Sequence, residues 1–384
     1  MQTLIVSTHF VHGVSASEWG KCLREQTLPG SVRKVVAFAT VGQLLRELIP
    51  ELPPTGEAAA VAGSVGPSGS LLRAWARRFG FPFVYAALPA RSDSSSAVEP
   101  SQIPVDFLRT YLDAEGSPPL FAIVGHPVAH SRSPVLHGRW IRDAGKAGLF
   151  LALDFVSETE FADSLPSLAD GGFRGLSVTH PYKAVAMELA SRVGPGAAAC
   201  GVANTLTMGS GEVEAENTDL VAMLQRLEEL RASGVWDGRS LGVLGAGGAA
   251  RATLAAARSL GIESYVWARR PEAADEIAQE FGAHSVRTPS AEGPSLVVHA
   301  TPVGRAGTPD DVLPPLDWVR SGTHVVDWVY LPDHPIVRRS AERMGATYED
   351  GSRLLVYQAA SSFGIWWGNE PSADQVSRAV RELR

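Results

Sequence analysis

Short apolar runs alternate with amphipathic stretches along the chain, and this alternation predicts an α/β protein. Each apolar run has the length of a strand, and the stretch after it repeats apolar residues at helical spacing. This order is typical of a parallel sheet covered by helices. In residues 1–114 it predicts four β-α units, with strands at 3–9, 33–39, 58–65 and 81–88 and helices at 15–26, 41–52, 70–79 and 105–113.

The pattern starts again after a short linker that contains glycine and proline, 114–119. It predicts strands at 120–127, 149–156, 172–178, 264–269, 295–301 and 323–330, and helices at 219–234 and 352–368. Between them, 239–261 has the pattern of a short apolar strand that runs into glycines and then a helix. We therefore predict three domains: 1–116, then 119–222 together with 353–384, and 223–352.

Composition and charge exclude several classes of protein. The chain has 384 residues and a net charge of −7, without a basic block, so we expect no nucleic-acid partner. It has no apolar run of about 18 residues and no pattern of a signal peptide, so we expect no membrane partner. Cys22 and Cys200 stand alone, without metal-ligand spacing. We expect no metal site and a cytoplasmic location.

A glycine-rich turn follows the predicted strand in GVLGAGGAARA, 242–252. Glycines in a strand–turn–helix context let the backbone approach a pyrophosphate, whose charge lies at the helix N-terminus. The stretch fits the GxGxxG/A fingerprint and predicts a dinucleotide site; the alternative is a tight structural turn. The predicted cofactor-binding residues here are Gly245, Ala246, Gly247, Gly248 and Ala249.

Two arginines, Arg269 and Arg270, stand at the end of the next predicted strand. Sites for NAD usually have an acidic residue near this position, which holds the ribose 2′-hydroxyl. Two cations instead suit a 2′-phosphate, which they can hold by charge-assisted hydrogen bonds. The pair predicts NADP as the cofactor, and the alternative is a solvated strand end.

Lys183 is unusual because the chain has only four lysines among its 34 basic residues. Arginine stays protonated in proteins, whereas lysine can exchange a proton. Lys183 is therefore a candidate acid or base, and the alternative is a surface or salt-bridge lysine.

Several short motifs occur in a fixed order after residue 119, and together they resemble the shikimate dehydrogenase family. They are HSRSP at 130–134, VTHPYK at 178–183, NT at 204–205, NTD at 217–219, GAGGAAR at 245–251, ATPVG at 300–304, DWVYLP at 327–332 and, after Gly351, LVYQAA at 355–360. Each motif alone is weak, but their order makes the resemblance specific. It implies a substrate domain and a Rossmann NADP-binding domain.

The resemblance also implies a reaction and a set of site residues. The reaction is the reversible reduction of 3-dehydroshikimate to shikimate by NADPH, with Lys183 as the proton donor and Asp219 as its partner. The residues implied for the substrate are Ser131, Ser133, Ser177, Thr179, Asn204, Tyr330 and Gln358, and those implied near the nicotinamide are Thr301 and Gly351.

Two alternatives to a shikimate dehydrogenase stay open. Ser177 replaces the family's usual asparagine, as in plant-type bifunctional relatives, and changes little. Leu220 and Ala222 replace the glycines that often follow NTD, and Ala268, Arg269 and Arg270 replace the common NRT, so a quinate/shikimate dehydrogenase is one alternative. The other is a non-catalytic sensor of the quinate pathway, against which Lys183, Asp219 and the glycine turn argue.

The first 114 residues resemble, more patchily, half of the (β/α)₈ barrel of type I 3-dehydroquinate dehydratase. The resemblance places four residues at that family's site: His9, Lys34, Arg73 and Gln102. A complete barrel needs eight units and about 250 residues, so we expect a structural or dimerising remnant in place of dehydratase activity. A half-barrel also exposes strand edges. We hypothesise that two chains pair their halves as a homodimer, or that another surface covers the edge.

Overall fold

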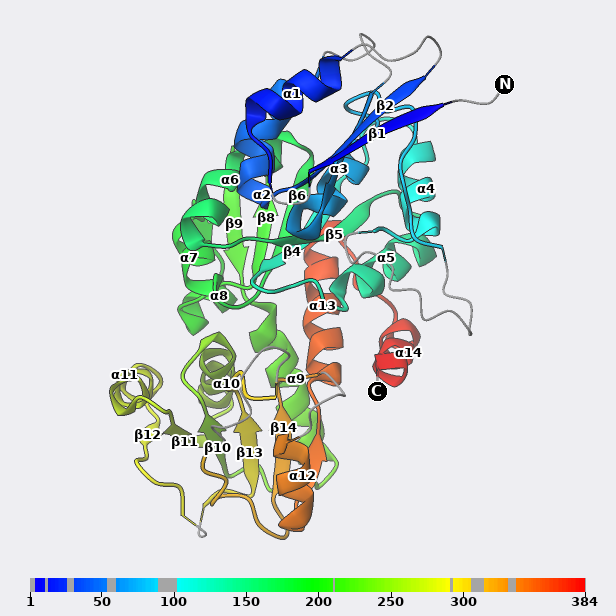
Figure 1. The fold of residues 1–384 in the computed structure, drawn as a ribbon. Helices are drawn as coiled ribbons and strands as arrows, with labels where there is room; N and C mark the ends of the chain where they lie inside the picture. Colours follow the sequence, from blue (N-terminus) through cyan, green and yellow to red (C-terminus); the bar gives the residue numbers. More distant parts are fainter. Residues whose placement is uncertain are drawn as a thin grey trace. The chain divides into compact units, whose positions relative to one another are not determined.

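Mostly parallel sheets with covering helices make up the protein in a computed structural model, in line with the sequence (Figure 1). The structure describes residues 4–10, 13–25, 31–53, 60–88, 102–209, 211–290, 293–304, 314–330 and 336–383. The chain divides into two compact units, Met1–Val185 with Leu206–Val213, and Ala186–Thr205 with Glu214–Arg384. It passes between the units near the strands β8 (Thr205–Met208) and β9 (Val213–Glu216).

The N-terminal part of the first unit is a parallel sheet with the order β1-β2-β3. A capping box starts its first helix, because Ser15 and Glu18 satisfy each other's backbone amides. The strands are β1 (Ile5–Phe10), β2 (Val32–Phe38) and β3 (Ala60–Val65). The helices are α1 (Ala16–Arg24), α2 (Val41–Gln43), α3 (Gly69–Ala74) and α4 (Val105–Asp113). After α2 the chain continues as a π-helical turn at Leu44–Leu48 and a 3₁₀ turn at Ile49–Glu51. Another 3₁₀ turn, at Gly66–Ser68, precedes α3.

The prediction of a fourth strand at 81–88 was wrong. Of this segment only Ala87 forms an isolated bridge, with Pro104. Pro82 lacks the N–H group that a ladder needs, which weakens the segment as a strand. The described residues before Leu120 therefore form a sheet of three strands, and they do not show a (β/α)₈ barrel.

A second parallel arrangement, β5-β4-β6, follows in the same unit. Its strands are nearly continuous apolar runs, as expected for strands covered on both faces. They are β4 (Leu120–Gly125), β5 (Leu149–Asp154) and β6 (Phe173–Val178), with the helices α5 (Ser133–Asp143) and α6 (Glu158–Asp170). The helix α7 (Lys183–Glu188) begins in this unit, and its second half belongs to the second unit.

A buried carboxylate joins the N-terminal sheet region to α6. Glu160 is 5% exposed, and its carboxylate accepts hydrogen bonds from the backbone N–H groups of Gly42 and Val156, each at 2.7 Å, and from the Thr40 hydroxyl. Nearby, the Trp75 indole donates to the Gly171 carbonyl at 2.8 Å. These bonds fix the N-terminal region on the α6 side of the unit.

Substituting Glu160 by Ala should lower the free energy of unfolding of this unit by roughly 1–3 kcal/mol, because three donors, among them the buried Gly42 N–H, lose their acceptor. Thermal unfolding followed by circular dichroism measures this change. Glu158→Ala is the matched control, since Glu158 is an exposed carboxylate in the same first turn of α6. Equal shifts for the two variants would show that Glu160 acts only through the helix dipole.

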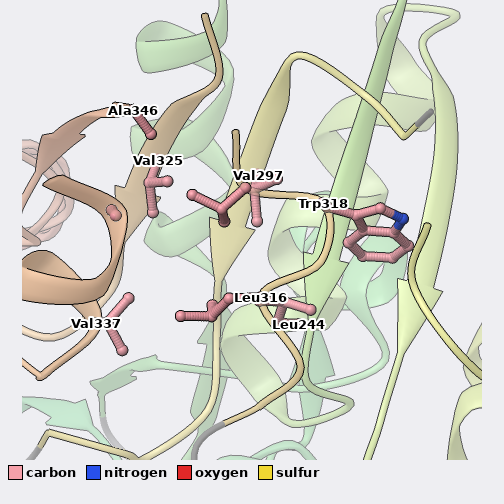
Figure 2. Close-up of a cluster of buried hydrophobic side chains, with 9 residues drawn as sticks. Leu244, Val297, Leu316, Trp318, Val325, Val337 and Ala346 are labelled. Carbon is pink, nitrogen blue, oxygen red and sulfur yellow. The ribbon is translucent and has the colours of Figure 1, made fainter. Parts of the chain in front are cut away.

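The second unit contains a six-stranded parallel sheet with the order β12-β11-β10-β13-β14-β15. One part of its core is an apolar cluster around Leu244, Val297, Trp318 and Val325 (Figure 2). The strands are β10 (Ser240–Leu244), β11 (Glu263–Trp267), β12 (His284–Ser285), β13 (Leu296–His299), β14 (His324–Asp327) and β15 (Thr347–Glu349). Its helices are α8 (Pro195–Cys200), α9 (Thr218–Ala232), α10 (Gly248–Ser259), α11 (Pro271–Phe281), α12 (Ile336–Arg343), α13 (Ser352–Trp367) and α14 (Ala373–Leu383), and the short strand β7 (Arg192–Val193) pairs with β9.

Candidate functional site

The predicted strand–glycine–helix unit is confirmed as β10, a turn and α10. Gly245 has a φ of +127°, and a Cβ there would lie 2.6 Å from the Ala300 carbonyl oxygen. Gly247 is exposed, and a Cβ on it would meet no atom within 4 Å. Gly247 is also the N-cap of α10 and makes no side-chain capping bond, so the helix N-terminus can receive an anion.

The two arginines predicted to hold a 2′-phosphate lie beside this turn. The Gly245 N–H donates to the Trp267 carbonyl at 2.7 Å, which places the end of β11 next to the glycines. Arg269 and Arg270 follow directly and are exposed. A cationic edge next to a helix N-terminus suits a phosphorylated dinucleotide.

The segment after β13 lies on the other side of the glycine turn. The Ala300 N–H donates to the Leu244 carbonyl at 2.8 Å, and half-buried Thr301 follows. Gly351 is buried at the start of α13 and donates to the Val329 carbonyl at 2.9 Å. Tyr330 is half-buried, and the last two residues of its motif lie outside the described residues.

In the first unit, the loops after β4 and β6 meet at one sheet edge. The Thr179 N–H donates to the Val124 carbonyl at 2.9 Å, and the His126 N–H donates to the His180 carbonyl at 3.0 Å. Because β4 and β6 are parallel neighbours, their carboxyl ends share this edge. The structure thus brings the loop that leads to Ser131 beside the loop that leads to Lys183.

Ser131 and Ser133, both implied to bind the substrate, are neighbours in the structure. The Ser133 N–H donates to the Ser131 hydroxyl at 3.2 Å, where α5 begins. Ser177, on β6, is 5% exposed, and its hydroxyl has no hydrogen-bond partner among the described residues. An unsatisfied buried hydroxyl is rare and fits a residue that awaits a ligand. Lys183 is half-buried at the first position of α7.

The remaining predicted substrate residues lie in the second unit. Asn204 is tied to Thr218, because its Oδ1 accepts from the Thr218 N–H at 2.7 Å and its Nδ2 donates to the Thr218 hydroxyl at 3.0 Å. Asp219, 5% exposed, lies in the first turn of α9. Gln358 is buried on α13, which packs against α9. Lys183 and Asp219 belong to different units, so their pairing stays a prediction.

The sequence analysis assigned no role to two acidic residues that shape these loops. Asp154, at the end of β5, accepts from the Val128 N–H at 3.1 Å and pairs with His126, which fixes the loop before Ser131. Asp327, at the end of β14, pairs with buried His299. For both residues the sequence did contain a signal, namely a charged residue at the end of a strongly apolar strand.

The four dehydratase-like residues line one pocket of about 200 Å³ in the N-terminal region. His9, Lys34, Arg73 and Gln102 come from separate segments, and Lys34 Nζ lies 4.3 Å from the centre of the Tyr85 ring. No aspartate or glutamate is among the described residues that line it. The loop before Gln102 lies outside the described residues.

Two further observations concern metals and membranes. Among the described residues, no group of three or more His, Cys, Asp or Glu side chains is placed to hold a metal ion. In the same part of the chain, no helix has both the length and the apolar character that crossing a membrane requires.

Comparisons with known proteins give one consistent result. The family model described as the shikimate dehydrogenase substrate binding domain matches residues 123–206. The shikimate dehydrogenase (NADP(+)) of Sinorhizobium fredii is 38% identical over 270 residues, which are 67% of this chain and 92% of that protein. The shikimate dehydrogenase (NADP(+)) of Cereibacter sphaeroides is 36% identical over 272 residues, which are 68% of this chain and 96% of that protein.

Solved structures agree with the sequence comparisons. The Thermus thermophilus shikimate 5-dehydrogenase in complex with NADP(H) and shikimate has a TM-score of 0.57 at 33% identity and covers 69% of this chain and 100% of that one. The Aquifex aeolicus shikimate dehydrogenase has a TM-score of 0.61 at 29% identity, with coverages of 69% and 98%.

Proposed function

This chain belongs to the shikimate dehydrogenase family, and we propose that it catalyses the NADP-dependent interconversion of shikimate and 3-dehydroshikimate. It is an oxidoreductase with NADP as its cofactor and a small-molecule substrate. The observation that carries the site proposal is the shared edge after β4 and β6, where Ser131 and Lys183 follow neighbouring loops.

We propose the following roles for the residues. NADPH would supply the hydride for the carbonyl carbon of 3-dehydroshikimate, and Lys183 Nζ gives a proton to the oxygen that gains the negative charge. In the reverse direction Lys183 accepts that proton. Asp219 orients the lysine, and the Ser131 and Ser133 hydroxyls hold the substrate carboxylate as neutral donors. The remaining substrate contacts are assigned to Ser177, Thr179, Asn204, Tyr330 and Gln358.

The direct test mixes the purified protein with shikimate and NADP⁺ and follows the absorbance of the reduced nicotinamide, with quinate and NAD⁺ in parallel. We expect turnover of the shikimate and NADP⁺ pair. Turnover of quinate at a comparable rate would instead make the chain a quinate/shikimate dehydrogenase. Binding of shikimate without turnover of any pair would favour the sensor.

The arginine pair should set the cofactor preference. In the double variant Arg269→Gln, Arg270→Gln we expect the KM for NADP⁺ to rise about 10–100-fold, because charge-assisted hydrogen bonds to the 2′-phosphate are lost. The KM for NAD⁺ should stay unchanged. Arg239→Gln is the control, since Arg239 is exposed and lies just before β10, at the opposite sheet edge. An unchanged KM for NADP⁺ in the double variant would contradict the assignment.

We further propose the domain division 1–116, 119–222 with 353–384, and 223–352, and a cytoplasmic location. The location is supported by Cys22 and Cys200, neither of which forms a disulfide. Limited proteolysis that cuts near 117 and 222 would support the division.

We propose that the N-terminal region is a dehydratase-like half-barrel that has kept its pocket and lost the dehydratase activity. The convergence of His9, Lys34, Arg73 and Gln102 on one pocket supports the resemblance. The described part of the lining has no carboxylate that could assist His9 in moving a proton, and this supports the loss of activity. Borohydride trapping with 3-dehydroquinate, followed by mass spectrometry, should give no adduct on Lys34. An adduct there would show a working Schiff-base site.

We also propose that β1 forms a homodimer contact. β1 is an outer strand of its sheet, and its residues alternate between exposed and half-buried. An uncovered strand edge is a template for pairing with another chain. Sedimentation velocity should show a dimer, and a monomer at micromolar concentration would exclude this pairing.

A further inference from the structure

A chain of buried hydrogen bonds runs beneath the segment after β13. The Tyr348 hydroxyl donates to Asp327 Oδ2 at 2.9 Å, Asp327 Oδ1 lies 2.8 Å from His299 Nδ1, and His299 Nε2 lies 2.6 Å from the Thr301 hydroxyl. The His299 and Asp327 side chains are 0% and 4% exposed. The two residues also stand opposite each other in the pairing of β13 with β14.

The partners of Asp327 decide which nitrogen of His299 carries a proton. The Asp327 carboxylate can only accept hydrogen bonds, and it takes one from the Val329 N–H at 2.8 Å. Burial and the charge of Asp327 raise the pKa of Tyr348, so the phenol keeps its proton and donates. The proton between His299 and Asp327 therefore lies on Nδ1. In the neutral ring, Nε2 then offers only a lone pair.

This tautomer fixes the direction of the Thr301 hydroxyl. With a neutral His299 ring, Nε2 accepts and Thr301 donates its only proton to it. Its oxygen is left as an acceptor, and the Val303 N–H occupies one side of it at 3.3 Å. One acceptor position of the Thr301 hydroxyl therefore remains. Thr301 is half-buried, and it directly follows Ala300, which lies beside Gly245.

We infer that His299 is a positioning residue that makes Thr301 an obligate acceptor for the N–H₂ group of the nicotinamide carboxamide. The inference rests on the proposed function and on the family resemblance, which implies that Thr301 lies near the nicotinamide. The amide nitrogen is the only donor on that ring, so the relay selects a carboxamide over an isosteric group without N–H.

The test compares the binding of NADP⁺ and of its 3-acetylpyridine analogue, in which a methyl group replaces the N–H₂, to the full chain by calorimetry. Dissociation constants are used because the two cofactors differ in redox potential. We expect wild type to bind the analogue about 5–160-fold more weakly, the range for leaving one acceptor unpaired away from water. His299→Leu should reduce this ratio to about 1–2, since Thr301 could then rotate and donate. His299→Gln should keep the ratio, because an amide offers one donor and one acceptor.

Thr301→Val removes the acceptor itself and replaces His299→Leu as the test variant if His299→Leu does not fold. In Thr301→Val we also expect the ratio of the two dissociation constants to fall to about 1–2. Adenosine 2′,5′-bisphosphate should bind all variants equally, because it lacks the nicotinamide. A wild-type ratio near 1, or an unchanged ratio in both His299→Leu and Thr301→Val, overturns the inference. If neither NADP⁺ nor the bisphosphate binds wild type, the proposed function fails first.

Discussion

Replacing Lys183 with Met should lower kcat for shikimate oxidation by roughly 10²–10⁴-fold, the usual contribution of a positioned acid or base. Methionine keeps the length and apolar stem of the side chain but cannot exchange a proton. Lys183 begins α7 at the edge shared by the loops after β4 and β6, so the backbone there should be unaffected. Steady-state kinetics with shikimate and NADP⁺ give the measurement.

Two further readouts separate chemistry from binding and folding. The KM for shikimate should change less than kcat, because the serines hold the carboxylate independently of the lysine. The matched control is Lys21→Met, since Lys21 is exposed on α1. A Lys183→Met enzyme with kcat within twofold of wild type would refute the mechanism.

Elements with strong local signals were predicted well from the sequence. The helix expected at 105–113 is α4 with the same bounds, and the glycine turn lies between β10 and α10 as expected. The expected strand at 81–88 failed, because apolar and aromatic content does not reveal whether a neighbouring strand edge is there to pair with. Pro82 was the one local feature of the sequence that argued against a strand there.

The residues of the candidate site likewise fall into those that the sequence could identify and those that it could not. Motif residues such as Lys183 and the glycines could be named, because their chemistry and spacing are visible along the chain. Glu160 and His299 could not, because their roles depend on partners distant in sequence or on an adjacent strand. Their positions in the sequence resemble an ordinary helix start and an ordinary strand end. Only the pairing of β13 with β14 places His299 opposite Asp327.

The second large effect concerns the two glycines of the cofactor turn, which should respond differently to the same methyl group. Gly245→Ala should lower the free energy of unfolding of the second unit by roughly 2–5 kcal/mol. Its φ of +127° is strained for any L-residue, and the added Cβ would meet the Ala300 carbonyl oxygen at 2.6 Å. Thermal unfolding without cofactor should therefore show a clear drop in Tm.

Gly247→Ala should leave that Tm nearly unchanged, because a Cβ there meets no atom within 4 Å and the backbone needs no glycine conformation. The substitution should instead weaken cofactor binding and raise the Kd for NADPH at least about tenfold. The reason is that the second glycine of this fingerprint lets the backbone approach the pyrophosphate. Calorimetric titration with NADPH measures this change. If Gly247→Ala bound NADPH as wild type does, the open space above Gly247 would not be the pyrophosphate site, and the glycines would serve only the turn. A fall in stability for Gly245→Ala together with weakened binding for Gly247→Ala would assign the first glycine to the fold and the second to the ligand.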